Sequence, residues 1–79
     1  MPEVHVFMAV GRTDEQKKGM MRDITRALVD NLGCPIDVVT VQIIESEWTD
    51  KMKGGKTFAE RYADSTPAGY QARVHDAGQ

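Results

Sequence analysis

Apolar residues dominate a short segment at the start of the chain. From Val4 to Val10 nearly every residue is apolar except His5, and the side chains of such a segment fall on two opposite faces if it is a strand. A strand that is apolar on both faces is typical of one with neighbours on both sides. We therefore expect a strand over residues 4–10 that is covered on both faces.

A helical pattern follows the break at Gly11. Thr13 and Gln16 have the spacing of a capping box, in which both side chains satisfy free backbone N–H groups at a helix start. Apolar residues then recur at spacings of three and four, which places them on one stripe of a helix. The stripe consists of Met20, Met21, Ile24, Ala27, Leu28 and Leu32. Gly33 followed by Pro35 is the usual order of residues at a helix end.

Two further elements are predicted after this helix. Residues 38–45 are rich in β-branched residues and predict a second strand, which completes a βαβ unit with parallel strands. Gly54 and Gly55 between two lysines predict a tight hairpin, because glycine tolerates the positive φ angles of two-residue loops. The fold class is therefore α+β, with one domain over residues 1–62 and an extended C-terminal tail over residues 63–79, where large aliphatic residues are scarce.

So small a fold is expected to associate with copies of itself. A chain of 79 residues buries little core, and one helix covers only one face of a two-stranded sheet. A second copy related by a twofold axis would extend the sheet to four strands, and further copies would cover its open face. Self-association is therefore a physical expectation from the sequence pattern.

Composition narrows the classes of function. The single cysteine, Cys34, excludes an internal disulfide, and with only two histidines we expect no metal site and no cofactor. Acidic and basic residues are mixed along the chain, with a net charge of −2, so we expect no nucleic-acid partner. No apolar run is long enough to span a bilayer and no signal segment is evident, so we expect no membrane partner and a cytoplasmic location.

The order of motifs resembles the 4-oxalocrotonate tautomerase family across residues 2–55. The features that carry the resemblance are Met1-Pro2 directly before a strand, the segment GRTDEQK over residues 11–17, and Pro35 before a β-branched strand that ends in Glu45. The resemblance implies a tautomerase (MIF-like) fold and a homohexamer built as a trimer of dimers. It also implies an isomerase that moves a proton, in an enol–keto or 1,3- or 1,5-shift, on a 2-oxo acid or related unsaturated carboxylate.

The resemblance also implies roles for individual residues. Pro2 corresponds to the catalytic base once Met1 is removed, and Arg12 to an arginine that binds the substrate carboxylate, commonly from a neighbouring subunit. Thr40 stands where the best-known member has a second arginine, and Lys51 stands where it has an aromatic residue. Trp48 lies near that loop, either as an apolar wall of the site or as packing at an interface. The predicted substrate-binding residues are thus Arg12, Thr40 and Trp48.

The chemistry of a terminal proline suits this role. A base for such a proton transfer needs a pKa near the working pH, and a terminal amine starts at about 7.7 to 8.0. Partial burial and the positive charge of Arg12 would lower the pKa of the Pro2 amine further. The nitrogen would then be neutral and able to accept a proton at pH 7.

Two alternatives remain open from the sequence. The first is a proline-dependent dehalogenase or hydratase in which Glu45, Glu47 or Asp50 activates water. Against it, Ala9 stands where such enzymes have an arginine, and Lys53 stands at the position that resembles their water-activating carboxylate. The second is an oligomeric binding module without turnover. His5 could tune the pKa of Pro2, but a hydrogen-bonded histidine within a strand is the simpler interpretation. Cys34 is expected to be structural.

Overall fold

The computed structural model describes residues 2–63 of the chain, which form two compact units. Among the described residues, the helical unit comprises residues 2–7 and 14–44, and the hairpin unit comprises residues 8–13 and 45–63. The boundary between the units crosses the first strand after Phe7 and the second strand after Ile44. Of the predicted tail over residues 63–79, all but Ala63 lies outside the described residues, so that division stays a prediction.

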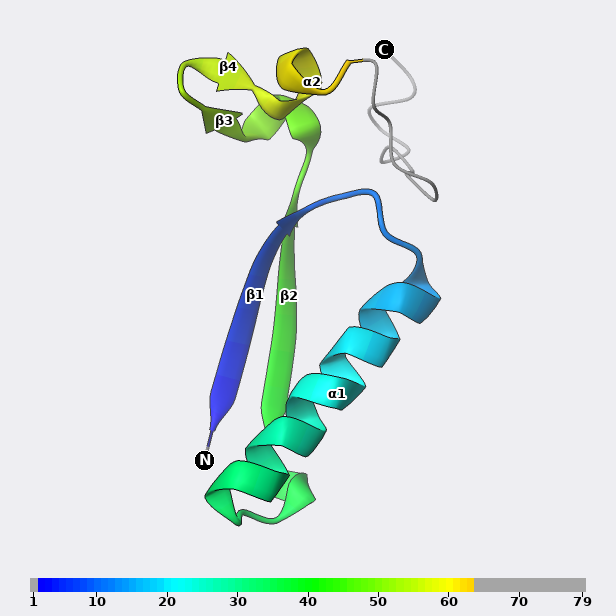
Figure 1. The fold of residues 1–79 in the computed structure, drawn as a ribbon, viewed down its shortest axis with the longest axis vertical. Coiled ribbons are helices and arrows are strands. Elements are labelled where there is room, and N and C mark those ends of the chain that lie inside the picture. Colours follow the sequence, from blue (N-terminus) through cyan, green and yellow to red (C-terminus); the bar gives the residue numbers. More distant parts are fainter. Residues whose placement is uncertain (1, 64–79) are drawn as a thin grey trace. The chain divides into compact units, whose positions relative to one another are not determined.

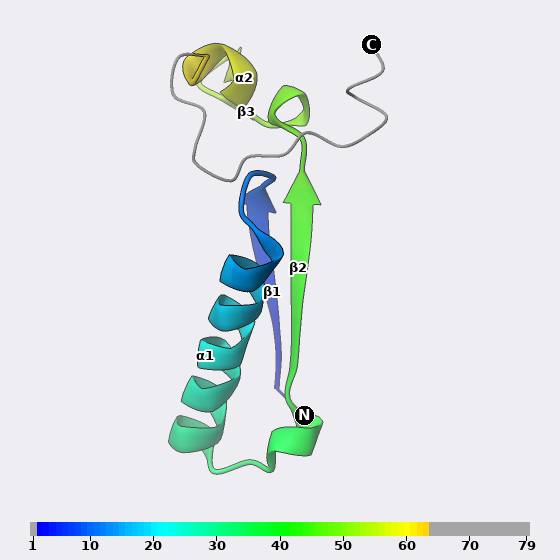
Figure 2. The same ribbon diagram turned by 90° about the vertical axis from the view of Figure 1, so that its right-hand side faces the viewer.

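Strands β1 (Glu3–Ala9) and β2 (Thr40–Ser46) form a two-stranded sheet. The Thr40 N–H donates to the Pro2 carbonyl at 3.1 Å, and the Val10 N–H donates to the Ser46 carbonyl at 2.9 Å. Because the two starts are joined and the two ends are joined, the strands are parallel, and their arrows point the same way in Figure 2. The α+β fold with a parallel βαβ unit is therefore confirmed.

Helix α1 (Asp14–Leu32) connects the two strands and lies beside them in both views (Figures 1 and 2). It begins directly after Thr13, and Asp14 and Glu15 in its first turn interact favourably with the helix dipole. It ends as predicted, because Gly33 has a φ of 71° and donates its N–H to the Val29 carbonyl at 2.9 Å.

The predicted apolar stripe of α1 is half-buried along most of its length and exposed at its end. Met20, Met21, Ile24 and Leu28 are half-buried, whereas Ala27 is exposed and Leu32 is 62% exposed. Leu32 is the last helical residue, and the chain turns away at Gly33, so no further turn of helix covers it. Val29 is half-buried although the stripe did not include it.

The β1 strand is covered on one face only within the helical unit. Val4 and Val6 are half-buried, whereas His5 is exposed and Phe7 is 70% exposed. The prediction of cover on both faces is thus not met by this chain alone, and an apolar position remains open to solvent. His5 Nε2 lies 2.8 Å from Glu3 Oε2, which confirms the hydrogen-bonded interpretation of this histidine.

The second strand begins later than predicted. Residues Ile36–Val38 form a 3-10 turn, η1, instead of entering a strand at Val38. Pro35 has an extended conformation at the start of this turn, and its carbonyl accepts the Val38 N–H at 3.2 Å. Local turn bonding after Pro35 therefore overrides the strand preference of the β-branched residues, and β2 starts at Thr40.

The hairpin unit contains a second 3-10 turn, a hairpin and a short helix. After η2 (Trp48–Asp50), strands β3 (Met52–Lys53) and β4 (Lys56–Thr57) pair antiparallel, with Lys53 opposite Lys56. Gly54 and Gly55 have φ values of 65° and 84°, so the predicted tight turn is confirmed. The chain then enters α2 (Phe58–Arg61), which the sequence analysis did not predict.

Candidate active site

Pro2 and Thr40 are neighbours in the helical unit. Pro2 immediately precedes β1 and is half-buried, and Thr40 opens β2 with an exposed side chain. The backbone hydrogen bond from the Thr40 N–H to the Pro2 carbonyl, 3.1 Å long, holds the two residues side by side. The structure thus brings together the predicted base and the residue that stands in for the second arginine. A threonine hydroxyl offers a neutral hydrogen bond there in place of a positive charge.

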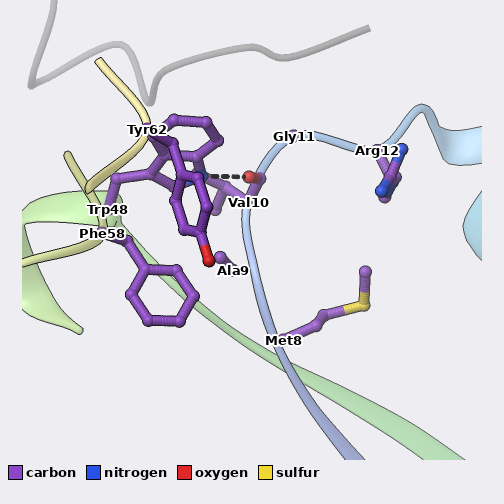
Figure 3. A pocket seen from close by; sticks show the side chains of 8 residues that line it. All are labelled: Met8, Ala9, Val10, Gly11, Arg12, Trp48, Phe58 and Tyr62. Carbon is purple, nitrogen blue, oxygen red and sulfur yellow. Dashed lines mark hydrogen bonds between the residues drawn. The ribbon is translucent and has the colours of Figure 1, made fainter. Parts of the chain in front are cut away.

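Arg12 and Trp48 share a pocket in the hairpin unit. The pocket has a volume of about 360 Å³. It is lined by residues from the end of β1 and the loop that follows, and by aromatic residues from η2 and from α2 and its C-terminal end. The lining residues are Met8, Ala9, Val10, Gly11, Arg12, Trp48, Phe58 and Tyr62. In the view of Figure 3 the three rings gather on one side of the Val10–Gly11 segment, and Arg12 and Met8 lie on the other.

Trp48 fixes the position of the chain segment that carries Arg12. Its indole N–H donates to the Val10 carbonyl at 2.8 Å, a contact between residues 38 positions apart in sequence. Val10 is 6% exposed, and its own N–H is bound to the Ser46 carbonyl. Gly11 follows with a φ of 139°, and the chain then reaches Arg12. Trp48 therefore acts both as packing and as a pocket wall, and the one polar atom of its side chain is bound to the Val10 carbonyl.

The aromatic wall is a set of edge-to-face contacts. The ring centroids of Trp48 and Tyr62 are 6.1 Å apart with planes at 70°, and those of Phe58 and Tyr62 are 5.5 Å apart at 77°. These arrangements are the favourable ones for aromatic pairs. The ammonium of Lys51 lies 5.8 Å from the centroid of the Phe58 ring, within the range of a cation–π contact.

Helix α2 holds Phe58 and Tyr62 in this wall through its cap. The Glu60 N–H donates to the Thr57 hydroxyl at 3.1 Å, and the Thr57 N–H donates to the Glu60 carboxylate at 2.8 Å. The Phe58 N–H donates to the Lys51 carbonyl at 2.8 Å, which ties the helix to the loop after η2. Sequence reasoning missed both aromatic residues. The signal that marks them is the Thr57–Glu60 spacing of a capping box, with aromatic residues four positions apart.

Among the described residues that line the pocket, Arg12 is the only cation. Its side chain is exposed, and no hydrogen bond or ion pair of its guanidinium occurs among residues 2–63. The carboxylates proposed for the hydratase alternative, Glu45, Glu47 and Asp50, do not line the pocket, and Glu47 is 7% exposed. The pocket is therefore suited to an anion with an apolar body.

The other candidate residues have local structural roles. The half-buried thiol of Cys34 lies 3.8 Å from the Leu28 carbonyl at the end of α1. No group of three or more His, Cys, Asp or Glu residues is arranged to hold a metal ion in the described part of the chain. Over the same residues, no helix combines the length and the apolar character that a membrane span requires.

Comparison with known proteins gives a consistent result. The family model described as "Tautomerase enzyme" matches residues 2–61. A protein of Bradyrhizobium diazoefficiens named "Probable tautomerase" is 67% identical over 63 residues, which cover 80% of this chain and 94% of that protein. The 2-hydroxymuconate tautomerase of Comamonas testosteroni is 44% identical over 43 residues, which cover 54% of this chain and 68% of that enzyme.

The solved structures agree with the sequence comparisons. The heterohexamer 4-oxalocrotonate tautomerase from Chloroflexus aurantiacus superposes with a TM-score of 0.71 and 30% identity, covering 76% of this chain and 97% of that chain.

Proposed function

The chain belongs to the tautomerase enzyme family and is an isomerase of the 4-oxalocrotonate tautomerase type, and on this basis we propose how its residues act. In the proposal Pro2, freed by removal of Met1, is the general base, and Arg12 binds the carboxylate of a 2-oxo acid or related unsaturated acid. The observation that carries the proposal is the place of Pro2 within the matched segment, directly before β1 and hydrogen-bonded to the first residue of β2. The catalytic domain would span residues 1–62.

The proposed reaction moves one proton and leaves the composition of the substrate unchanged. The neutral Pro2 nitrogen takes the proton of the enol hydroxyl or of an acidic carbon, and the electron pair shifts through the conjugated system. The protonated proline then returns the proton to a different carbon, which gives the isomeric 2-oxo acid. Arg12 holds the carboxylate by paired charge-assisted hydrogen bonds and stabilises the negative charge that develops.

The proposed site is shared between copies of the chain. The seven residues of β1 lie between Pro2 and Arg12 along the chain, and the two residues belong to different compact units. In the proposal the Arg12 that serves a given Pro2 comes from another copy. We propose a homohexamer, as a trimer of dimers, by analogy with the hexamer of the Chloroflexus enzyme.

Two further features accompany this proposal. The single free cysteine is compatible with a reducing compartment, and we propose a cytoplasmic enzyme that needs no cofactor. The dehalogenase or hydratase alternative gains no support from the pocket, because no carboxylate among the described residues lines it.

The test compares the native chain with Pro2→Ala. The measured quantity is the rate of ketonisation of 2-hydroxymuconate and of phenylenolpyruvate, and intact mass shows whether Met1 has been removed. Loss of the secondary amine base should lower kcat by about 100-fold or more, within the range for general acid–base catalysis. Equal activity of the two proteins would remove Pro2 from the mechanism. A native chain with a free Pro2 that accelerates neither reaction would favour the binding module instead.

A further inference from the structure

We propose that the pocket of the hairpin unit selects a monocarboxylate whose other end is a flat aromatic ring, in preference to a dicarboxylate. This inference rests on the proposed function, because it names the class of acid that the same site would isomerise. It is carried by the charges and the rings around the pocket, not by the chemistry at Pro2.

The charge of the lining favours one carboxylate. Arg12 is the only cation among the eight lining residues, and its guanidinium has no partner within residues 2–63. One carboxylate satisfies it by a bidentate pair of hydrogen bonds. A second carboxylate placed in the pocket would lose its hydration against aromatic carbon and gain no cation in return.

The apolar side of the pocket is built for a ring. Trp48, Phe58 and Tyr62 meet edge to face. Met8 lines the other side with Arg12 and adds a thioether, a group that makes favourable contacts with aromatic rings. The Trp48 N–H is bound to the Val10 carbonyl at 2.8 Å, so this residue presents only apolar surface to a ligand. A planar aromatic group gains edge-to-face or offset contacts here that an alkyl chain does not gain.

The size of the pocket and the position of Lys51 agree with this interpretation. The volume of about 360 Å³ lies at the lower end of the range for small-molecule sites, about 300 to 1,000 Å³. Lys51 lies beside the aromatic wall, but it is not among the described residues that line the pocket. Its ammonium lies 5.8 Å from the Phe58 centroid, where it supports the ring.

The binding test uses Trp48, the only tryptophan of the chain, as a fluorescent reporter within the pocket. The native protein is titrated with three acids that carry no enol and undergo no turnover. These are 3-phenylpropionate, with one carboxylate and a ring, hexanoate, with one carboxylate and an alkyl chain, and adipate, with two carboxylates. We expect the Kd of 3-phenylpropionate to be at least about tenfold lower than that of adipate, and lower than that of hexanoate. Adipate binding as tightly as 3-phenylpropionate would overturn the inference.

Ring variants identify the residues responsible. Tyr62→Phe keeps the ring and should keep the preference for 3-phenylpropionate over hexanoate, whereas Tyr62→Leu should reduce it several-fold. Phe58→Leu is the second variant and should act in the same direction, and thermal unfolding identifies which variants are folded. Folded leucine variants that retain the full preference would overturn the role of the aromatic wall. Lys51→Met should leave the adipate Kd unchanged, and a weakening confined to adipate would instead assign Lys51 a second carboxylate.

Turnover separates this inference from the proposed function. The same protein is assayed on phenylenolpyruvate and on 2-hydroxymuconate, and we expect the larger kcat/KM for the aromatic acid. Selective binding of 3-phenylpropionate without turnover of either enol would refute the proposed function and leave the pocket selectivity standing. Rapid turnover with a preference for 2-hydroxymuconate and for adipate would refute the selectivity and leave the function standing.

Discussion

At the scale of single residues, Arg12 and Trp48 differ in whether their side chains have a hydrogen-bond partner among the described residues. The Trp48 indole already donates to the Val10 carbonyl, so the residue is fixed as part of the pocket wall. The Arg12 guanidinium is exposed and has no partner among the described residues, although it lines the same pocket. A positive charge left open beside an apolar wall is a recognition group for an anion.

This difference predicts the effect of substitutions at Arg12. Arg12→Ala should lower kcat/KM for phenylenolpyruvate about 10- to 100-fold, because it removes charge-assisted hydrogen bonds worth about 1.5 to 3 kcal/mol. Arg12→Lys is the matched control and should recover only part of the loss, since an ammonium lacks the bidentate geometry of guanidinium. The measurement is kcat/KM on the carboxylate substrate and on a neutral aryl enol of similar size. Losses of the same size on both substrates would contradict direct binding of the carboxylate.

At the scale of elements, the short helix α2 determines where two of the three pocket rings lie. A helix of four residues has no stability of its own, because helix nucleation is costly. Its capping box supplies the missing interactions, with the Thr57 and Glu60 backbone N–H groups each bound by the other residue's side chain. Arg61 adds a contact of 3.4 Å from its guanidinium to the Lys53 carbonyl in the hairpin.

The capping box therefore predicts a link between Glu60 and the pocket. Glu60→Ala should destabilise the protein by about 1 kcal/mol, the typical value of a helix cap, and should raise KM for phenylenolpyruvate as Phe58 and Tyr62 become less ordered. Glu60→Gln keeps an acceptor for the Thr57 N–H and should behave like the native chain. Thermal unfolding and the near-ultraviolet circular dichroism of Trp48 measure the two effects. A lower Tm with unchanged KM and unchanged dichroism would mean that the cap stabilises the fold without positioning the rings.

The elements also show how far sequence reasoning reaches. The parallel βαβ unit, the Gly33 end of α1 and the Gly54-Gly55 hairpin were predicted, because each depends on local periodicity or on a backbone angle that glycine adopts. The turn η1 was missed because β-branched residues after Pro35 carry the pattern of a strand. Helix α2 was missed because four residues are too few to display a helical period.

Only part of the candidate site could be predicted, because some of its residues come together through contacts that leave no pattern along the chain. Pro2, Arg12, Thr40 and Trp48 were named from the sequence, and the structure places them in two pairs, one in each unit. Phe58 and Tyr62 join the pocket through contacts with Trp48 and with each other, and no pattern along the chain reveals such contacts.

At the scale of the whole molecule, the proposed site is completed by a second copy of the chain. In this proposal Pro2, before β1, and Arg12, after it, each serve a site together with a residue of a neighbouring copy. The exposed face of β1 carries Phe7, which is 70% exposed and provides apolar surface for association. Activity and assembly should therefore be lost together, and an inactive chain should be able to complete the site of another.

Mixing two inactive variants tests this sharing directly. Pro2→Ala and Arg12→Ala, unfolded together at equal concentration and refolded, should regain activity that neither shows alone. If subunits mix at random, about one quarter of the sites pair an intact Pro2 with an intact Arg12 from a neighbour, and activity should approach that fraction of the native value. Native mass spectrometry confirms that mixed oligomers have formed, and the same variants refolded separately and then combined without exchange serve as the control. Mixed oligomers without any recovery would mean that both groups of a site belong to one chain, because no such chain in the mixture carries both.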